Sequence, residues 1–249
     1  MTHTFGMAMP SDIYPVFTVK HIQNPNRLYA IPLLGALFKF IILIPQFIMI
    51  LFVVIVFLLV ALLINPFVVL FTGKYWSVTH SLAVAYVTLL TKVMLYLPGL
   101  TDKYPGFNFQ ANEDFTLDIP CPTAPNRLFA IPFFGGLARY ILLIPFMIFI
   151  TVLEFTSWLA MVGSSFVVLF AGKYPESTYE LSRDYWRISI AYIMYLFGLS
   201  DSYPSFWISM NHKDIKIALI VLGAIFYIST QLMSIGINLF VNSLLNSIK

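Results

Sequence analysis

Residues 25–45 read PNRLYAIPLLGALFKFIILIP, and residues 125–145 read PNRLFAIPFFGGLARYILLIP. Thirteen of the 21 positions are identical, and most of the others exchange one apolar or basic residue for another. A spacing of 100 residues is too long for a solenoid unit, whose period is about 20–50 residues. The sequence therefore predicts one supersecondary module in two copies, with the halves related by a pseudo-two-fold axis.

Two further segments repeat in the same order. FVVLFTGKY from Phe67 returns as FVVLFAGKY from Phe166, and YLPGLTDKYPGF from Tyr96 returns as YLFGLSDSYPSF from Tyr195. The offset falls from 100 to 99 between the first repeated segment and the second, so the second copy has lost one residue after Pro145. The expected units are a first membrane repeat over residues 1–110, a second over residues 111–211, and a C-terminal transmembrane helix over residues 212–249.

The composition indicates an α-helical integral membrane protein. Of the 249 residues, 59% are hydrophobic and only 10% are charged, whereas soluble domains have roughly 25% charged residues. A soluble fold of this size could not bury so much apolar surface, so lipid must be the missing solvent. The net charge of +3 is small and spread along the chain, which argues against a nucleic-acid partner. The single cysteine, Cys121, excludes an internal disulfide and a cysteine-cluster metal site, and we expect no cofactor.

The first apolar run is too long for one straight crossing. No charge occurs between Lys39 and Lys74, a stretch of 34 residues, or about 51 Å of helix against a hydrocarbon thickness of about 30 Å. Pro45 and the pair Asn65-Pro66 are expected to break this run. The second copy has a softer Gly-Ser-Ser interruption at Gly163.

The second helix of each copy is expected over residues 76–97 and 179–199. The first of these can cross if Lys92 extends toward the nearer interface. The other opens with four charged residues, and only residues 188–199 are continuously apolar, a length more typical of an interfacial or re-entrant segment. Together with a last uncharged run over residues 217–241, the sequence predicts five crossings, two in each copy and one at the C-terminus.

Short segments that alternate aromatic or branched residues with polar ones flank the helices and resemble strands. We expect them to form one small β cap on a single membrane face, so that each copy is a hairpin that returns to its starting side. These segments are YPVFTVKH from Tyr14, GFNFQ from Gly106, DFTLDIP from Asp114 and SFWIS from Ser205.

The distribution of Lys and Arg predicts that the strand side faces the cytoplasm. The first 21 residues have no basic start followed by an apolar core, so we expect a cytoplasmic N-terminus in a bacterial inner membrane. The strand side holds Lys20, Arg27, Lys39, Lys103, Arg127, Arg139, Lys213 and Lys216, and the opposite side holds Lys74, Lys173, Arg183, Arg187 and Lys249.

The order of these motifs resembles a bacterial membrane family that is catalogued as domain of unknown function 4389. The resemblance extends over nearly all of residues 14–210, although Trp76 stands where a proline is expected after the first Gly-Lys-Tyr. It implies an integral membrane protein and no established activity. The matching residues are Asn26-Arg27-Leu28, Phe71-Thr72-Gly73-Lys74-Tyr75 and Asp102-Lys103-Tyr104-Pro105, then Asn126-Arg127-Leu128, Phe170-Ala171-Gly172-Lys173-Tyr174-Pro175 and Asp201-Ser202-Tyr203-Pro204.

Two Gly-Lys-Tyr corners supply candidates for contact with lipid headgroups. Gly73-Lys74-Tyr75 and Gly172-Lys173-Tyr174 each follow an apolar helix. In one interpretation each corner is a helix end, with glycine at the cap, lysine near phosphates and tyrosine in the aromatic belt. In the other, the corners recognise a specific lipid. Arg27 and Arg127, which precede the bilayer, complete this set of candidates.

Three acidic residues invite hypotheses. Asp102 and Asp201 either form ion pairs with Arg27 and Arg127 that lock the helix ends together, or cap the turns before Tyr-Pro. Glu154 lies near the expected middle of the bilayer, where a carboxylate suggests function, and the first copy has a valine at that position. It is a protonated acid bonded within the bundle, a contact to a partner helix, or part of a proton or ion path.

The last apolar run carries a polar segment, Ser229-Thr230-Gln231, with Gly223 and Gly236 on either side. Small and amide residues of this kind favour helix packing in membranes. The neighbouring helix belongs either to this chain or to another.

No motif of enzyme chemistry is found in the sequence: it has no nucleophile elbow, no paired metal-binding histidines and no phosphate-binding glycine loop. We assign no catalytic residue. We expect a non-enzymatic scaffold or accessory subunit whose partners are membrane lipids and other membrane subunits or a second copy of the chain. The alternative is a protein that binds or transports lipids or other hydrophobic molecules, and a lipid-modifying enzyme is a third reading.

Overall fold

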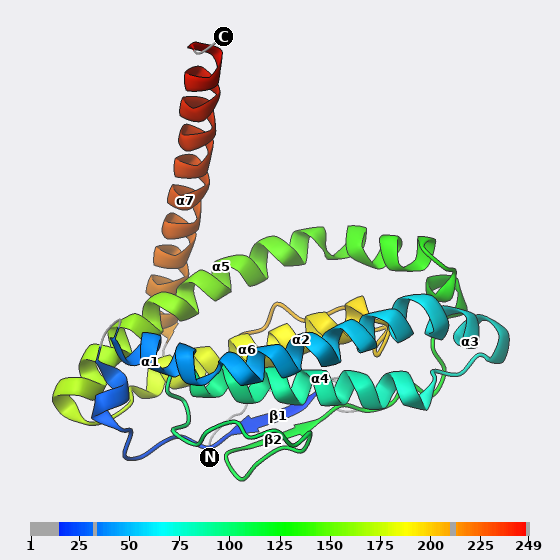
Figure 1. Cartoon of the computed structure of the whole chain (residues 1–249), viewed down its shortest axis with the longest axis horizontal. Helices are drawn as coiled ribbons and strands as arrows, with labels where there is room; N and C mark the ends of the chain where they lie inside the picture. The colour runs from blue at the N-terminus through cyan, green and yellow to red at the C-terminus, as the bar shows by residue number, and fades with distance from the viewer. Residues whose placement is uncertain (1–14, 32–33, 210–212, 248–249) are drawn as a thin grey trace.

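The structure is a computed structural model that describes residues 15–31, 34–209 and 213–247. Its body is elongated, and α2, α4, α5 and α6 run along the long axis (Figure 1). The first copy contains β1 (Val16–Val19), η1 (Arg27–Ala30), α1 (Leu34–Ile42), α2 (Ile44–Leu59), η2 (Val60–Ile64), α3 (Asn65–Thr72) and α4 (Ser77–Tyr96). Then follow β2 (Phe115–Asp118), η3 (Arg127–Ala130), α5 (Phe134–Ala171), α6 (Glu176–Leu196) and α7 (Lys213–Ser247). The start of the first repeat, including Tyr14 of the expected strand, and the boundary at 211–212 lie outside the described residues.

The apolar run of the first copy is interrupted before Pro45, as expected, but the break expected at Asn65-Pro66 is wrong, because the chain remains helical from Ile44 to Thr72. α1 ends at Ile42, and α2 begins at Ile44 with Pro45 in its first turn. The first N–H groups of a helix have no partner within it, so a proline costs no hydrogen bond there. Before Asn65-Pro66 the chain makes a π-helical turn, η2, which accommodates one extra residue within a helix. This turn lies at the place where the second copy is one residue shorter.

The second copy forms one continuous helix instead. α5 has 38 residues, and neither Pro145 nor Gly163 ends it, so the interruption expected at Gly163 is wrong. The hydroxyls of Ser164 and Ser165 both donate to the Met161 carbonyl, over 2.8 and 3.0 Å. Because hydroxyl side chains can bond back to the preceding turn without ending a helix, the Gly-Ser-Ser segment remains helical.

The two copies lie antiparallel to each other. η1 packs on α1 and on α5, whereas η3 packs on α3 and on the opposite end of α5. The first copy therefore enters and leaves at one end of the body, and the second copy does so at the other end (Figure 1).

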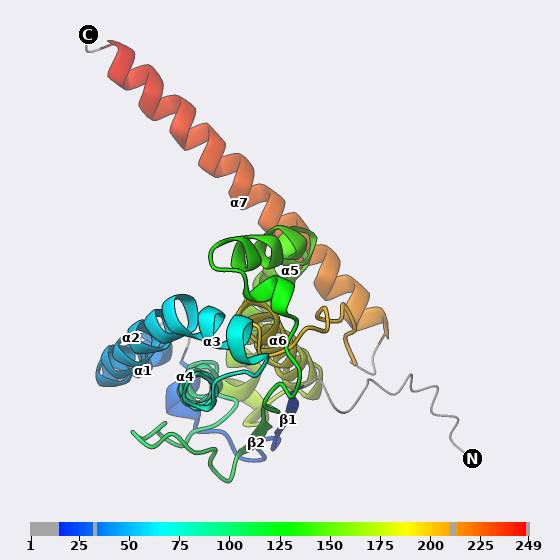
Figure 2. The ribbon, with the colours of Figure 1, turned by 90° about the vertical axis from the view of Figure 1, so that its right-hand side faces the viewer.

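The small sheet has two strands. β1 and β2 pair antiparallel, with Val16 opposite Asp118 and Val19 opposite Phe115. The pairing joins the start of the first copy to the start of the second beneath α4 and α6 (Figures 1 and 2). One buried apolar cluster then combines side chains of α2, α4, α6 and both strands, so the two halves share a core.

The other two segments expected to be strands are irregular. Several of their backbone groups are bonded to side chains of neighbouring helices instead of to another strand. In residues 106–110, Gln46 donates to the Gly106 carbonyl over 2.8 Å. In residues 205–209, Lys216 donates to the Ile208 carbonyl over 2.7 Å.

The last helix packs on the body only through its first part. A Cβ added to Gly223 would lie 2.8 Å from the Thr156 Cβ of α5, and the rings of Phe155 and Phe226 meet at 5.4 Å. Gly223 therefore permits a close crossing within this chain. Beyond the crossing, α7 leaves the body on the side away from β1 and β2 (Figures 1 and 2).

Four helical segments are long and apolar enough to cross a membrane, which is consistent with a membrane protein: Ile44–Thr72, Ser77–Tyr96, Phe134–Ala171 and Lys216–Ser243. Within the described part of the chain, α6 is not among them, so there are four candidate segments where the sequence predicts five crossings. The first half of α6 is too polar because it carries Glu180, Arg183, Asp184 and Arg187.

Candidate functional site

Two cavities lie at opposite ends of the body, each between the first apolar helix and α5. The first cavity, of about 550 Å³, lies between η1–α1 and the second half of α5. The second cavity, of about 600 Å³, lies between η2–α3 and the start of α5, beside η3. Equivalent residues line both: Leu37 and Leu137, for example, or Lys39 and Arg139. The cavities are therefore counterparts built by the two copies.

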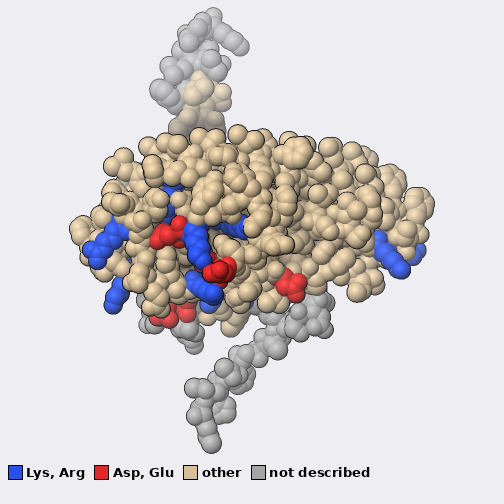
Figure 3. Space-filling view, turned by 60° about the horizontal axis from the view of Figure 1, so that its bottom comes forward, with Lys and Arg blue, Asp and Glu red and all other residues tan. Residues whose placement is uncertain are grey.

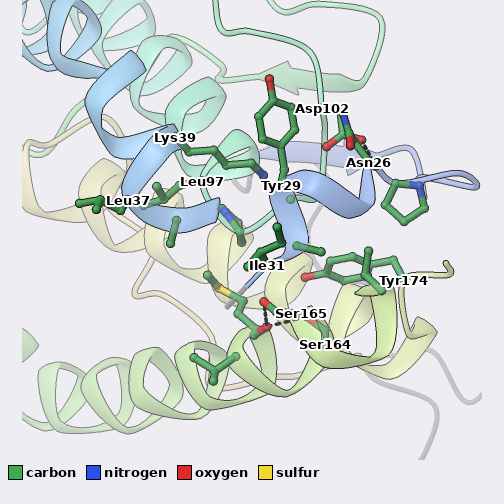
Figure 4. A pocket seen from close by; sticks show the side chains of 18 of the residues that line it. Asn26, Tyr29, Ile31, Leu37, Lys39, Leu97, Asp102, Ser164, Ser165 and Tyr174 are labelled. Atoms are coloured by element: carbon green, nitrogen blue, oxygen red, sulfur yellow. Dashed lines mark hydrogen bonds between the residues drawn. The ribbon is translucent and has the colours of Figure 1, made fainter. Parts of the chain in front are cut away.

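The first cavity is apolar apart from a few groups at its inner end (Figure 4). Lys39 extends from one side, and the ring of Tyr174 reaches in from the other with its hydroxyl directed inward. That hydroxyl is buried and makes no hydrogen bond to the described residues, although those of Ser164 and Ser182 lie near it. Burial raises the pKa of Tyr174 to about 12, so the hydroxyl stays protonated and can donate.

The second cavity differs at this position. The hydroxyl of Tyr75, the counterpart of Tyr174, donates to the Phe197 carbonyl over 3.2 Å. Pro98 of the first copy occupies the position equivalent to Phe197, and it lines the first cavity. The tyrosine is thus bonded in the second cavity and unbonded in the first.

Lys39 is a buried cation at the end of a helix. Lys39 is only 2% exposed, and its Nζ donates to the Tyr96 carbonyl at the end of α4 over 2.9 Å. The rings of Tyr29 and Tyr96 lie 5.3 and 5.1 Å from Nζ, close enough for cation–π attraction. Burial lowers the pKa of Lys39 to about 8, and the nearby Asp102 carboxylate offsets part of that shift.

Arg139 takes the equivalent position in the second copy and makes more bonds. Nη1 donates to the Tyr195 carbonyl over 2.8 Å and to the Ser200 carbonyl over 3.0 Å, and Nη2 forms an ion pair with Asp201. A positive charge is favourable at the carbonyl end of a helix. Each copy therefore closes its second helix with a buried basic residue, lysine in one and arginine in the other.

Of the two alternatives for the aspartates, the ion pair with Arg27 or Arg127 is not formed among the described residues. Asp102 Oδ2 accepts the backbone N–H of Asn26 over 2.6 Å, and Asp201 Oδ2 accepts that of Asn126 over 2.8 Å. These bonds fix the two entry turns. The guanidinium that pairs with Asp201 comes from Arg139 and not from Arg127.

Arg27 and Arg127 contact the other copy instead. A Cβ added to Gly172 would lie 2.9 Å from the Arg27 Nε, and one added to Gly73 would lie 3.0 Å from the Arg127 Nε. Both glycines end apolar helices with φ near +70°, where the last carbonyls favour a cation. The two arginines thus form a reciprocal contact between the ends of the copies, and both remain exposed.

The Gly-Lys-Tyr corners are helix ends, as one of the two interpretations holds, but their tyrosines are placed differently. Lys74 and Lys173 are exposed. Tyr75 and Tyr174 are buried and line the cavities, so they do not belong to an aromatic belt. The sequence pattern gave no sign of this, because burial depends on the antiparallel packing of the copies.

Trp76 does not alter the first corner. Its φ of −74° is close to the −62° of Pro175. Its N–H, which a proline lacks, donates to the Asn65 side chain over 3.2 Å, and the second copy has Ser164 in place of that asparagine. The two corners therefore turn alike with different partners.

Glu154 lies in the narrow space beside the first cavity. It lines a smaller hollow of about 70 Å³ with Leu97, Trp158 and Met161, residues that also line the first cavity. Its side chain is exposed and forms no hydrogen bond or ion pair with the residues that the structure describes. No cluster of His, Cys, Asp or Glu suited to a metal ion occurs among those residues.

Sequence reasoning missed Lys39 and Arg139 as site residues and counted them only as indicators of orientation. A usable signal was present, because a basic residue recurs at the same position of an otherwise apolar segment in both copies. A buried, repeated cation indicates a specific partner, which here is the end of a neighbouring helix.

Comparison with known proteins returns one finding. Residues 136–208 match the model of the family described as "Domain of unknown function (DUF4389)", which supports the resemblance seen in the sequence. The match runs from the start of α5 to the segment after α6 and covers one copy only. No curated protein and no solved structure matches the chain.

Proposed function

We propose that this membrane protein binds an acyl chain with a polar end, such as a fatty acid or a membrane lipid, in the first cavity, and acts by binding and not by catalysis. The observation that carries this proposal is the buried, unbonded hydroxyl of Tyr174 at the inner end of an apolar cavity. A buried donor without an acceptor costs about 1–3 kcal/mol, and a bound ligand would remove that cost.

The cavity has the size and lining for such a ligand. Its volume of about 550 Å³ falls within the range of about 300–1,000 Å³ of small-molecule sites. Leu37, Phe40, Trp158 and Val162 line it and are themselves between 45% and 58% exposed. The opening is therefore bordered by apolar side chains that would lie against lipid, which gives an acyl chain a path without water.

The polar groups favour an acceptor with negative charge. Tyr174 can donate to a carboxylate, an ester carbonyl or a phosphate oxygen. The ammonium group of Lys39 lies across the cavity (Figure 4) and attracts an anion through a poorly screened medium. The second cavity offers less, because Tyr75 already donates to Phe197.

The test uses the purified protein in mild detergent and a photoactivatable fatty acid that carries a diazirine on its chain. We expect cross-links to peptides of α1 and of the second half of α5. Tyr174→Phe should weaken binding about 3- to 10-fold, the equivalent of one hydrogen bond. Tyr75→Phe is the matched control and should leave labelling of the first cavity unchanged.

A second pair of variants guards against a change in folding. Ala36→Phe adds a ring to the wall of the first cavity, and Gly136→Phe does so at the equivalent position of the second. Labelling of the first cavity should be lost in Ala36→Phe and kept in Gly136→Phe. Equal labelling of all four variants, or labelling only on α7, would refute the proposal.

A second candidate, the scaffold or accessory subunit, is favoured by the outer part of α7. Gln231, Ser234 and Asn238 follow one another at three- and four-residue spacing and are exposed, so they share a helix face. Amides on a membrane helix gain roughly 0.6–2 kcal/mol from a partner helix. We propose that this face pairs with another membrane chain or a second copy of this one.

This candidate predicts that the double variant Gln231→Leu/Asn238→Leu dissociates a complex seen with the wild-type protein. The control is Leu232→Ala/Leu239→Ala, which changes exposed apolar residues of the same helix. Size-exclusion chromatography with light scattering in mild detergent measures the mass. A wild-type protein that is monomeric and elutes alone would exclude the scaffold role.

The proposed location is the inner membrane with the strand-bearing face in the cytoplasm. Lys20 and Lys103 are exposed on that face, as the excess of positive charge on cytoplasmic segments requires. The native thiol of Cys121 is exposed just after β2. A thiol reagent that cannot cross membranes, added to intact cells, should leave it unlabelled, and labelling would reverse the orientation.

A further inference from the structure

The body has one apolar face and one polar face, and the division between them runs along its length. Exposed hydrophobic residues continue along α1–α3 from Leu34 to Phe71 and along α5 from Phe134 to Phe170. The only charged residue exposed along these helices is Glu154. On the strand side, charged side chains gather over β1, β2 and the segments around them (Figure 3), among them the exposed Lys20, Lys103, Glu113 and Asp118.

The polar face includes irregular chain that runs back along α4 and along part of α6. After α4, Asn108 accepts from Lys92 near the end of that helix, over 2.9 Å, and Ile119 accepts from His80 near its start, also over 2.9 Å. The chain thus runs back along the whole of α4. Irregular backbone exposed to lipid does not occur in the hydrocarbon region, so α4 does not cross the bilayer with this segment beside it.

The segment after α6 repeats this arrangement. Ser200 accepts from Arg139 at the end of α6, and Ser209 donates its backbone N–H to Asp184 near the middle of α6 over 2.6 Å, so this segment runs back along the second half of the helix. It carries Tyr203, Phe206 and Trp207, which are between 39% and 60% exposed. Exposed aromatic residues beside an apolar face are typical of the level of the lipid headgroups.

The lengths of the apolar helices also argue against a crossing along the body axis. The apolar row of α5 spans 38 residues, or about 57 Å, nearly twice the hydrocarbon thickness of about 30 Å. The row of α1–α3 is of similar length. A helix lying along the membrane has no such limit. Meanwhile α7 leaves the body on the side away from the strands, past α5 (Figure 2), and has ample length to cross.

We propose that the body lies along one face of a lipid bilayer, with the outer surfaces of α1–α3 and α5 immersed in a single leaflet, and that α7 alone crosses. The occupant of the apolar face is the lipid of that leaflet. The polar segments and the sheet then remain in water, and both cavities open toward acyl chains. This inference rests on the distribution of polar and apolar surface and does not require that either cavity binds a ligand.

The test compares the two ends of the body in sealed membrane vesicles. Lys74 and Lys173 are exposed at opposite ends, beside Arg127 and Arg27 respectively. In a Cys121→Ser background, Lys74→Cys and Lys173→Cys should react with an impermeant maleimide from the same side of the membrane. That side should also label native Cys121 in the wild-type protein. Asn242→Cys, near the end of α7, should react only from the other side.

Two results would overturn the proposal. If Lys74→Cys and Lys173→Cys react from opposite sides, the helices cross along the body axis. If Asn242→Cys reacts from the same side as the others, α7 is not a crossing helix. A lipid-dissolved photoreactive probe should also label Ile148→Cys on α5 in native membranes. Protection of that position from the probe would mean that another protein covers the face.

Discussion

The two copies agree at their ends and differ in their cavities. Asn26 and Asn126 both donate their backbone N–H to an aspartate three residues after the glycine that follows the second helix. Gly73 and Gly172 both lie close to an arginine of the other copy. In the cavities, by contrast, one tyrosine is bonded and its counterpart is not. The basic residue is lysine in one copy and arginine in the other.

This difference separates residues that hold the fold from residues free to take another role. We interpret contacts found in both repeated segments as contacts that hold the fold. Tyr174, Lys39 and Glu154, which differ from their counterparts in bonding or in type, all lie at or beside the first cavity. The asymmetry is concentrated there, which is why we assign function to the first cavity and structure to the second.

The largest predicted difference between the copies concerns the basic residues. Arg139→Met leaves Asp201 and two carbonyls without their partner and should lower the free energy of unfolding by about 3 kcal/mol. Lys39→Met removes a charge that burial already disfavours and should change it by less than about 1 kcal/mol. Chemical denaturation in mild detergent measures both. Equal losses would contradict the distinction.

The helix ends should respond alike in both copies. Gly73→Ala and Gly172→Ala place a side chain at positive φ and against an arginine, and each should lose about 1–2 kcal/mol. Removing the facing arginine as well should restore the steric part of the loss. The control is Gly136→Ala, where a Cβ meets no atom within 4 Å and helix propensity improves. A loss of stability in only one of the two glycine variants would show that the two corners are not equivalent.

The pH dependence of stability should come from the first copy. The pKa of Lys39 is about 8 in the folded protein and 10.5 in the unfolded chain, so folding favours its neutral form. Stability from this group is complete above pH 10.5 and is lost as the pH falls to 8, by at most about 1.4 kcal/mol per pH unit. Relative to Lys39→Met, the wild-type protein should become more stable as the pH rises from 8 to 10.5. A constant difference would show that Lys39 titrates normally.

The smallest effect is expected for the residue that the second copy lacks. Deleting Leu63 from the π-helical turn should convert η2 to regular helix and preserve both flanks, at a loss within about 1 kcal/mol. Deleting Gly163 from α5 is the control, because it would rotate the following residues, including Tyr174, by about 100°. If the Leu63 deletion unfolds the protein as the control does, the turn is not a simple insertion.

Much of the local structure could be predicted from the sequence. The repeat located the matching turns and the glycines that end the apolar helices, and Pro45 marked the break between α1 and α2. Such features depend on a few neighbouring residues, so their signals survive in each copy. The continuous helix through Gly163 was not predicted, since it depends on hydroxyl bonds from Ser164 and Ser165 to one carbonyl.

The relative orientation of the copies could not be predicted, because identical segments fold alike whichever way they face each other. The contact of Arg27 with Gly172, the burial of Tyr75 and Tyr174, and the cavities all follow from the antiparallel arrangement. The polar chain beside the helices could not be predicted for a related reason. Helix length and composition do not reveal that irregular polar chain lies along α4 and α6.

The central claim is that the apolar helices of both copies lie along the membrane as one surface. Polarised infrared spectroscopy of the whole protein in oriented bilayers measures it directly, because the amide dichroism reports the direction of the helix axes. We predict that most of the helical signal lies near the membrane plane, with a smaller component along the normal from the 35 residues of α7. A signal dominated by helices along the normal would contradict the account.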